Sequence, residues 1–182
     1  GIVSGKMPDL IDILSNFDEK DTLCVRPSSE SIDWGGPGAV LNIGMNEERC
    51  LHLSKYIGEK AAVELYFRFI QAYSVSVARL DPDVFDHIAG ANGNSVSAAL
   101  AAYKDEIEES FPQSIEHQLS EVLRSMARAW EGTSARLLRE AKGAPADAGL
   151  GLVIQKMAFG VGDGESGSGV LQLVNSDTGQ SQ

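Results

Sequence analysis

Residues 153–160 read VIQKMAFG and are followed at residues 162–170 by GDGESGSGV. The first segment is short, rich in β-branched and aromatic residues and closed by a glycine, which favours a β-strand over a helix. Four glycines lie among the eight residues 162–169, more than a tight hairpin tip needs to reach positive φ. The pattern predicts a β-hairpin over residues 150–175 whose tip either approaches a ligand closely or is simply mobile.

The segment 22–46 has the pattern of two short strands separated by a loop. Residues 22–26 form an apolar run that ends at Arg26, and residues 40–43 form a second one. Between them, residues 27–38 are rich in serine and glycine, which indicates a loop. The sequence therefore predicts a strand, a loop and a strand before the chain becomes helical.

Residues 47–142 show helical periodicity over most of their length. Asn46 is a typical N-cap residue, and two glutamates follow it in the first turn, where the helix dipole favours negative charge. Apolar residues later recur at three- and four-residue spacing, as along residues 115–130. Residues 176–182 are polar and are expected to fray.

Composition limits the classes of partner. The chain has 182 residues, enough for a single domain with a buried core, and a formal net charge of −11. This charge argues against nucleic acid and anionic membrane as partners, because both bind basic surfaces. The sequence has no signal peptide and no apolar run long enough to span a membrane, so we expect a cytoplasmic protein. Reduced thiols at Cys24 and Cys50 are then expected, and a disulfide between them stays open.

Four sequence words together resemble the N-terminal nucleotide-binding domain of pyruvate phosphate dikinase. The first is CVRPSS at residues 24–29 with VLNIGMN at 40–46, and the second is YFRFIQAY at 66–73. The third is FPQ at 111–113, seventeen residues before Trp130, and the fourth is the stretch that begins at residue 153. The resemblance implies an α+β fold, part of an ATP-grasp-like domain with short strands and a helical insertion in the middle. It also implies ATP as the ligand of one nucleotide-binding domain over residues 1–182.

Arg26 follows a strand and precedes a serine- and glycine-rich loop, where a planar guanidinium can meet phosphate oxygens. The resemblance implies that it contacts the phosphates of ATP; the alternative is a structural salt bridge. The loop after it could hold phosphates through backbone N–H groups, with Ser28, Ser29, Gly35 and Gly36 as candidates. The alternative for this loop is a flexible connector.

Gln155, Lys156 and Met157 resemble the strand whose backbone binds adenine in ATP-grasp-like sites. Backbone recognition tolerates changes of side chain, so this feature can persist in a divergent sequence. The alternative is that Met157 is a plain core residue.

The sequence also departs from the family pattern. Residues 33–39 read DWGGPGA where the family has a methionine-rich run, and Leu173 and Val174 stand where it has threonine and arginine. An aliphatic pair cannot donate hydrogen bonds to an oxyanion. We assign no catalytic residue and no metal ligand, and expect Mg²⁺ only if it arrives with the nucleotide.

Three functions remain open at this point; one of them, an enzyme completed by a partner chain, has no specific feature of the sequence in its favour, and the other two follow. The first is an ATP-binding domain of a phosphotransferase family. It would have no turnover on its own, because the phosphate-binding lysine and the metal-binding acids of the family have no counterpart in residues 1–182. The second is a non-catalytic interaction module that no longer binds nucleotide and contacts a protein partner or a second copy of itself. Strong nucleotide binding would favour the first function, and its absence the second.

Overall fold

A computed structural model describes residues 2, 5–88, 95–160, 165, 167, 169 and 173. Its elements along the chain are α1 (Leu10–Leu14), β1 (Leu23–Ser28), η2 (Ile32–Trp34), β2 (Val40–Ile43), α2 (Glu47–Ile57), α3 (Glu59–Ser76), η3 (Pro82–Phe85), α4 (Ser95–Ile107), α5 (Ile115–Glu131), α6 (Thr133–Ala141) and β3 (Gly151–Lys156). Helices and a small antiparallel sheet occur together, which confirms the predicted α+β class. The second strand of the hairpin predicted for 150–175 and the tail 176–182 fall outside the described residues, apart from a few isolated positions.

Strand β1 lies in the middle of the sheet, antiparallel to β2 on one side and to β3 on the other. Its register with β3 is continuous, from Leu23 opposite Lys156 to Ser28 opposite Gly151. Its register with β2 slips by one residue, and Asn42 takes up the extra length with a φ of 61°. Two strands distant in sequence, β1 and β3, are therefore the most closely paired elements of the sheet.

Strand β1 continues two residues beyond the predicted end at Arg26, through Pro27 and Ser28. A proline fits here because the backbone nitrogens of β1 alternate between its two neighbours. The backbone nitrogens of Thr22 and Arg26 face β3, so the nitrogen of the next residue, Pro27, faces the side of β2. The pairing of β2 with β1 ends opposite Val25, before Pro27 is reached. The missing N–H of Pro27 therefore removes no ladder hydrogen bond.

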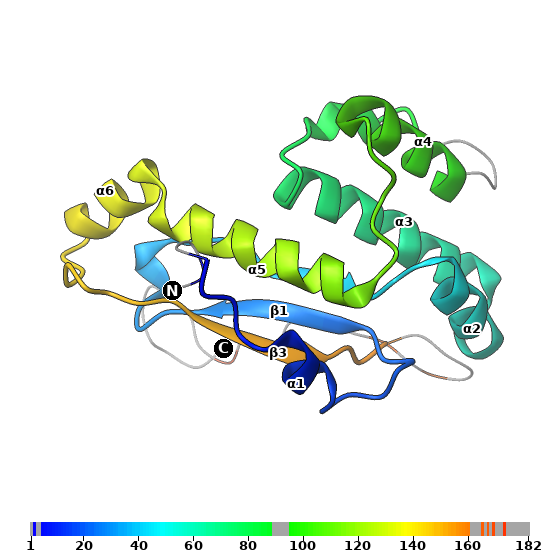
Figure 1. Cartoon of the computed structure of the whole chain (residues 1–182), viewed down its shortest axis with the longest axis horizontal. Helices are drawn as coiled ribbons and strands as arrows, with labels where there is room; N and C mark the ends of the chain where they lie inside the picture. Colours follow the sequence, from blue (N-terminus) through cyan, green and yellow to red (C-terminus); the bar gives the residue numbers. More distant parts are fainter. Residues whose placement is uncertain are drawn as a thin grey trace.

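Helices α3 and α5 cover one face of the sheet and close the main core (Figure 1). The sheet contributes buried aliphatic side chains to this core, and each helix contributes one apolar stripe. The buried members are Leu23, Val25, Val40 and Ile43 from the sheet, Tyr66, Phe69, Ile70 and Tyr73 from α3, and Leu119, Val122, Leu123 and Met126 from α5. Helices α2 and α4 pack on α3, and α1 packs against α5.

Aromatic side chains join α3 and α4 to the segment that leads into α5. Phe111 lies edge-on to Phe69, Tyr73 and Tyr103, with ring centroids 5.8, 5.1 and 5.1 Å away. Edge-to-face packing of this kind stabilises a core beyond the apolar area it buries. The helical insertion is thereby fixed to the layer that covers the sheet.

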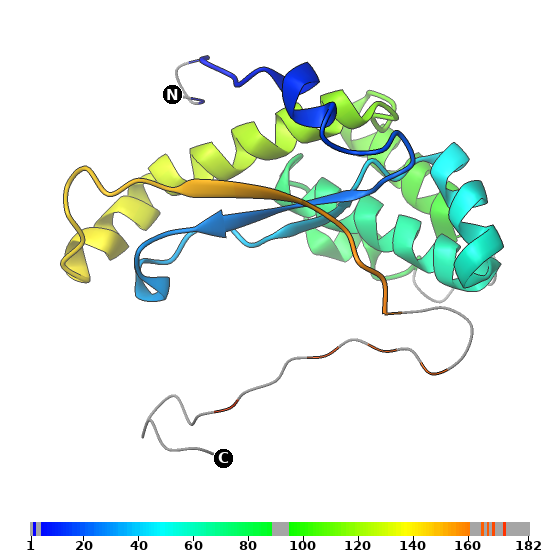
Figure 2. The ribbon, with the colours of Figure 1, turned by 90° about the horizontal axis from the view of Figure 1, so that it is seen from below.

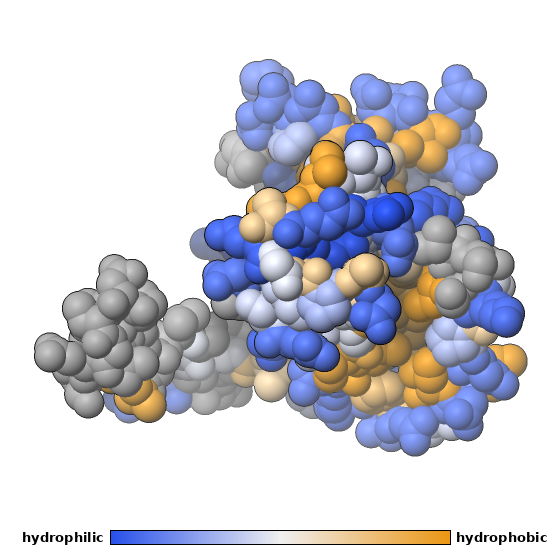
Figure 3. Space-filling model, turned by 90° about the vertical axis from the view of Figure 1, so that its left-hand side faces the viewer, coloured by the Kyte–Doolittle hydropathy of each residue, from blue (hydrophilic) through white to orange (hydrophobic). Residues whose placement is uncertain are grey.

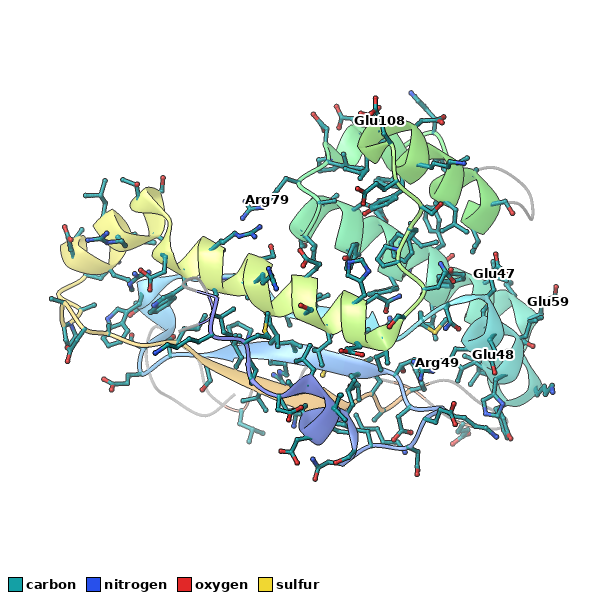
Figure 4. The ribbon with its side chains drawn as sticks, in the orientation of Figure 1. Glu47, Glu48, Arg49, Glu59, Arg79 and Glu108 are labelled. Carbon is teal, nitrogen blue, oxygen red and sulfur yellow. The ribbon has the colours of Figure 1, made fainter. Side chains whose placement is uncertain are left out.

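The turn between β2 and α2 is held by two buried or half-buried polar side chains. Gln118 of α5 accepts from Gly44 N at 2.6 Å and donates to the carbonyl oxygens of Met45 and Pro112. Arg49, which Figure 4 shows at the start of α2, donates from Nη1 to the carbonyl oxygen of Gly44 at 2.7 Å. Burial lowers the pKa of Arg49, while nearby Asp21, Glu19 and Glu48 act to raise it. These contacts fix the end of the sheet against α5.

Candidate functional site

The sheet has an outer face, turned away from α3 and α5, and Figure 2 shows β1 and β3 on that side with no described helix in front of them. Cross-strand partners point to the same face and neighbours alternate. Leu23 and Val25 are buried toward the helices, so Cys24 and Arg26 point outward together with their partners Gln155 and Val153. The structure thus brings Arg26 and Gln155 onto one surface.

This outer face combines one cation with exposed apolar side chains. Val153 is 43% exposed and Leu41 of β2 is 46% exposed, while Arg26 and Gln155 are also exposed. Large aliphatic side chains at such exposure on one sheet face leave apolar surface in water. The face is suited to a ligand or partner that has both an apolar surface and negative charge.

Arg26 makes no ion pair or side-chain hydrogen bond with any residue that the structure describes. The structural salt bridge considered for it therefore has no carboxylate in that part of the chain. Since no described residue engages its guanidinium, all five N–H donors are open to an oxyanion on the outer face as far as the described part of the chain is concerned.

Lys156 lies elsewhere. It is paired with Leu23, so alternation places it on the opposite side of β3 from Gln155. Its Nζ lies 2.6 Å from Oδ1 of Asp21, and this hydrogen bond raises the pKa of Lys156. The Lys156 ammonium is thus engaged within the protein.

The backbone N–H and C=O of Lys156 point in a different direction from its side chain. Met157 N donates to the carbonyl oxygen of Thr22 at 2.8 Å, which closes the ladder between β1 and β3. Because the amide and carbonyl of successive residues alternate across an antiparallel strand, those of Lys156 point away from β1. Of the three residues predicted to bind adenine, Lys156 offers its backbone at the far edge of β3, whereas the N–H of Met157 is already used.

The segment predicted as a phosphate loop is folded onto the protein. Ser28 belongs to β1, opposite Gly151, and Ser29 Oγ donates to the carbonyl oxygen of Ser31 at 2.8 Å. A Cβ atom on Gly35 would lie 2.9 Å from Leu138 Cδ2, and one on Gly36 would lie 3.5 Å from the ring of Trp130. Both glycines have positive φ, so their conformation and their close contacts already explain why glycine is found there.

Trp34, in the middle of this segment, packs inward. A bulky indole beside a phosphate loop would change what the loop presents to a ligand, but Trp34 is buried, with 9% of its surface exposed. The short η2 turn carries it inward, next to α6. The segment is therefore part of the packing between the sheet and α6, rather than an open connector.

The cysteines and the residues near the C-terminus complete the set of sequence features. Cys24 and Cys50 are free thiols. Leu173 is 68% exposed, and Val174 lies outside the described residues. Among residues that the structure describes, no group of three or more His, Cys, Asp or Glu side chains could hold a metal ion. None of the described helices is both long and apolar enough to cross a membrane.

Sequence reasoning missed Arg139, a buried arginine nine residues after Trp130. Its guanidinium carbon lies 3.8 Å from the centre of the Trp130 ring. An arginine within a helix of otherwise exposed charged residues gives little sign of burial, and only the nearby tryptophan offered one.

Comparison with known proteins finds similarity to pyruvate, phosphate dikinase of several organisms. It is 30% identical to pyruvate, phosphate dikinase of Rhizobium meliloti over 178 residues, which is 88% of this chain and 20% of the relative. It is 29% identical to pyruvate, phosphate dikinase of Clostridium symbiosum over 184 residues, 90% of this chain and 21% of the relative. It is 26% identical to the chloroplastic pyruvate, phosphate dikinase 1 of Zea mays over 175 residues, 87% of this chain and 18% of the relative. The chain spans about a fifth of the length of these relatives. No family model matches it.

Proposed function

We propose, because the chain is related in sequence to one segment of pyruvate, phosphate dikinase, that it binds ATP on the outer face of its sheet. The sheet and its covering helices would then be part of an ATP-grasp-like domain. The phosphates would meet Arg26, and the adenine would meet the free backbone edge of β3 at Lys156.

The observation that carries this proposal is the position of these two features on paired strands. Arg26 is opposite Val153, three residues from Lys156, so the two features are separated by about 10 Å along the strand. This separation is comparable with the span from the base of an extended nucleotide to its phosphates. The exposed Val153 lies directly beside Arg26 on the same face and offers apolar surface to the ligand, and the exposed Gln155 lies between Val153 and Lys156.

We further propose that the chain has no phosphoryl transfer by itself. Leu173 and Val174 occupy the positions at which the resemblance places threonine and arginine, and neither can donate a hydrogen bond to a developing charge. Mg²⁺ would arrive only with the nucleotide. The phosphotransferase activity of the relatives is therefore not extended to this chain alone.

Calorimetric titration of the purified chain with ATP and with AMP, each with and without Mg²⁺, tests the proposal. We expect ATP to bind more tightly than AMP, because only ATP carries phosphates that reach Arg26. Arg26→Ala should weaken ATP binding by roughly 1.5–3 kcal/mol, the range for a hydrogen bond to a charged group. Arg124→Ala, which removes a half-exposed arginine on α5, should leave the affinity unchanged.

A second function is favoured by the exposed Leu41 and Val153. These side chains also suit a protein surface, either of a partner or of a second copy of this chain. If no nucleotide binds at millimolar concentration and the chain associates in solution, the outer face is an interaction surface. Leu41→Asp should then abolish the association, because it places a charge in the contact.

A further inference from the structure

A cavity lies where the end of α5, helix α6 and the start of β3 meet. Its volume is about 980 Å³, and Trp130, Arg136, Arg139 and Leu152 are among the residues that line it. Figure 3 looks onto this end of the molecule and shows hydrophilic and hydrophobic surface side by side. Leu152 packs toward the helix-covered core, so the cavity lies on the other side of the sheet from Arg26.

Arg139 is built into the wall of this cavity. The residue is 8% exposed, its guanidinium lies 3.8 Å from the centre of the Trp130 ring, and Nη1 donates to the carbonyl oxygen of Trp130 at 2.7 Å. Trp130 is itself fixed, because its Nε1 donates to the carbonyl oxygen of Ala148 at 3.3 Å. Stacking on one side and a hydrogen bond at one nitrogen leave the guanidinium in a defined orientation.

The remaining donors of Arg139 are not used by the part of the chain that the structure describes. A guanidinium has five N–H groups, and one side-chain hydrogen bond of Arg139 is found there. No carboxylate in that part lies within ion-pair distance of Arg139 or of Arg136, one turn earlier on α6. A guanidinium that is held in a fixed orientation and has unused donors beside a cavity makes this wall a place for an oxyanion.

The other lining residues restrict the kind of anion. Glu131 and Asp147 are exposed and also line the cavity, so they lower its net positive charge and disfavour a dianion. Leu150 and Leu152 are half-buried and give the cavity an apolar wall. From this arrangement we propose that the cavity binds a carboxylate that carries an apolar body, with the carboxylate held by Arg139 and Arg136.

Titration with benzoate tests the proposal, with the neutral benzamide and inorganic phosphate as comparison probes. In the isotope-labelled full chain, benzoate should shift the indole N–H resonance of Trp130 and the amides of Leu150 and Leu152. Arg136→Gln, at an exposed position that should not affect folding, is expected to weaken benzoate binding about tenfold. Arg128→Gln removes an exposed arginine of α5 outside the cavity and should leave binding unchanged.

Arg139→Lys keeps the charge but loses the planar donor group, so it should weaken benzoate binding at least as much as Arg136→Gln. If this variant does not fold, Arg136→Gln decides the question alone. The proposal is overturned if benzoate causes no shift, if benzamide binds as well as benzoate, or if Arg136→Gln binds like the unchanged chain. Tighter binding of inorganic phosphate would overturn the choice of a carboxylate. Arg26→Ala should bind benzoate as tightly as the unchanged chain does. The benzoate titration therefore tests the cavity independently of the proposed nucleotide site.

Discussion

Gln118 is the residue on which the end of the sheet most depends. It is fully buried, and it serves one backbone donor and two backbone acceptors in the turn between β2 and α2 and before α5. Gln118→Met fills a similar volume but leaves these groups without partners. We expect the free energy of unfolding to fall by about 3 kcal/mol or more, since each unsatisfied buried group costs about 1–3 kcal/mol. Urea unfolding followed by circular dichroism measures this loss. A fall no larger than that of Gln71→Met, at a half-exposed position of α3, would contradict it.

Tyr73 gives the fold a dependence on alkaline pH. Burial raises the pKa of Tyr73, and Tyr103 and Glu121 raise it further. The folded state then holds the phenolic proton more tightly than the unfolded state does. The resulting stability is fully present below the unfolded pKa of about 10 and is lost progressively as the pH rises from that value toward the higher pKa of the folded state.

The free energy of unfolding should therefore decrease between about pH 9 and pH 11, and it should decrease less in Tyr73→Phe. Urea unfolding of both proteins at the two pH values provides the comparison. Tyr56→Phe is the matched control, because Tyr56 is 64% exposed. Equal pH dependence in Tyr73→Phe and the unchanged chain would exclude the role given to Tyr73.

The exposure of Arg26 could be predicted from the sequence, whereas the ion pair of Lys156 could not. An arginine at the end of an apolar strand is exposed for a local reason, namely the alternation of the strand. Lys156 forms an ion pair with Asp21, which lies just before the neighbouring strand β1 and far from Lys156 in sequence. Contacts of this kind follow from the pairing of β1 with β3, which no local pattern reports.

Among the elements, the segment between β1 and β2 differs most from the sequence prediction. Its glycines predicted an open loop, whereas Gly35 packs against Leu138 of α6. Gly35→Ala should lower the free energy of unfolding by about 1–2 kcal/mol, because Gly35 has a φ of 69° and little space for a Cβ atom. Thermal or urea unfolding measures this effect. Gly38→Ala should have a small effect, since a Cβ there meets nothing within 4 Å. Equal effects of the two substitutions would mean that Gly35 is not constrained by α6.

The helices and the first strands were predictable because their signals are local. Asn46 accepts from Arg49 N at 2.8 Å, as a predicted N-cap should, and an apolar stripe marked α5. The position of β3 was not predictable in the same way. Its sequence indicated a strand, but only the fold shows that it pairs with β1, more than a hundred residues earlier. Arg139 was missed for a similar reason, since its burial depends on the approach of α6 to Trp130.

For the whole molecule, we propose that the two strands β1 and β3 form a nucleotide-binding surface. Two helices cover one face of their sheet, and the other presents Arg26 next to β3, whose far edge pairs with no strand in the part of the chain that the structure describes. The net charge of −11 makes this local arrangement decisive, because the overall field repels a nucleotide.

The most direct test is to map ATP binding by amide chemical shifts in the isotope-labelled chain. If the proposal is right, ATP shifts the amides of residues 24–28 and 153–157 and none in α4, and AMP causes smaller shifts at the Arg26 end. Shifts confined to other parts of the chain, or none at millimolar ATP, would contradict nucleotide binding at this surface.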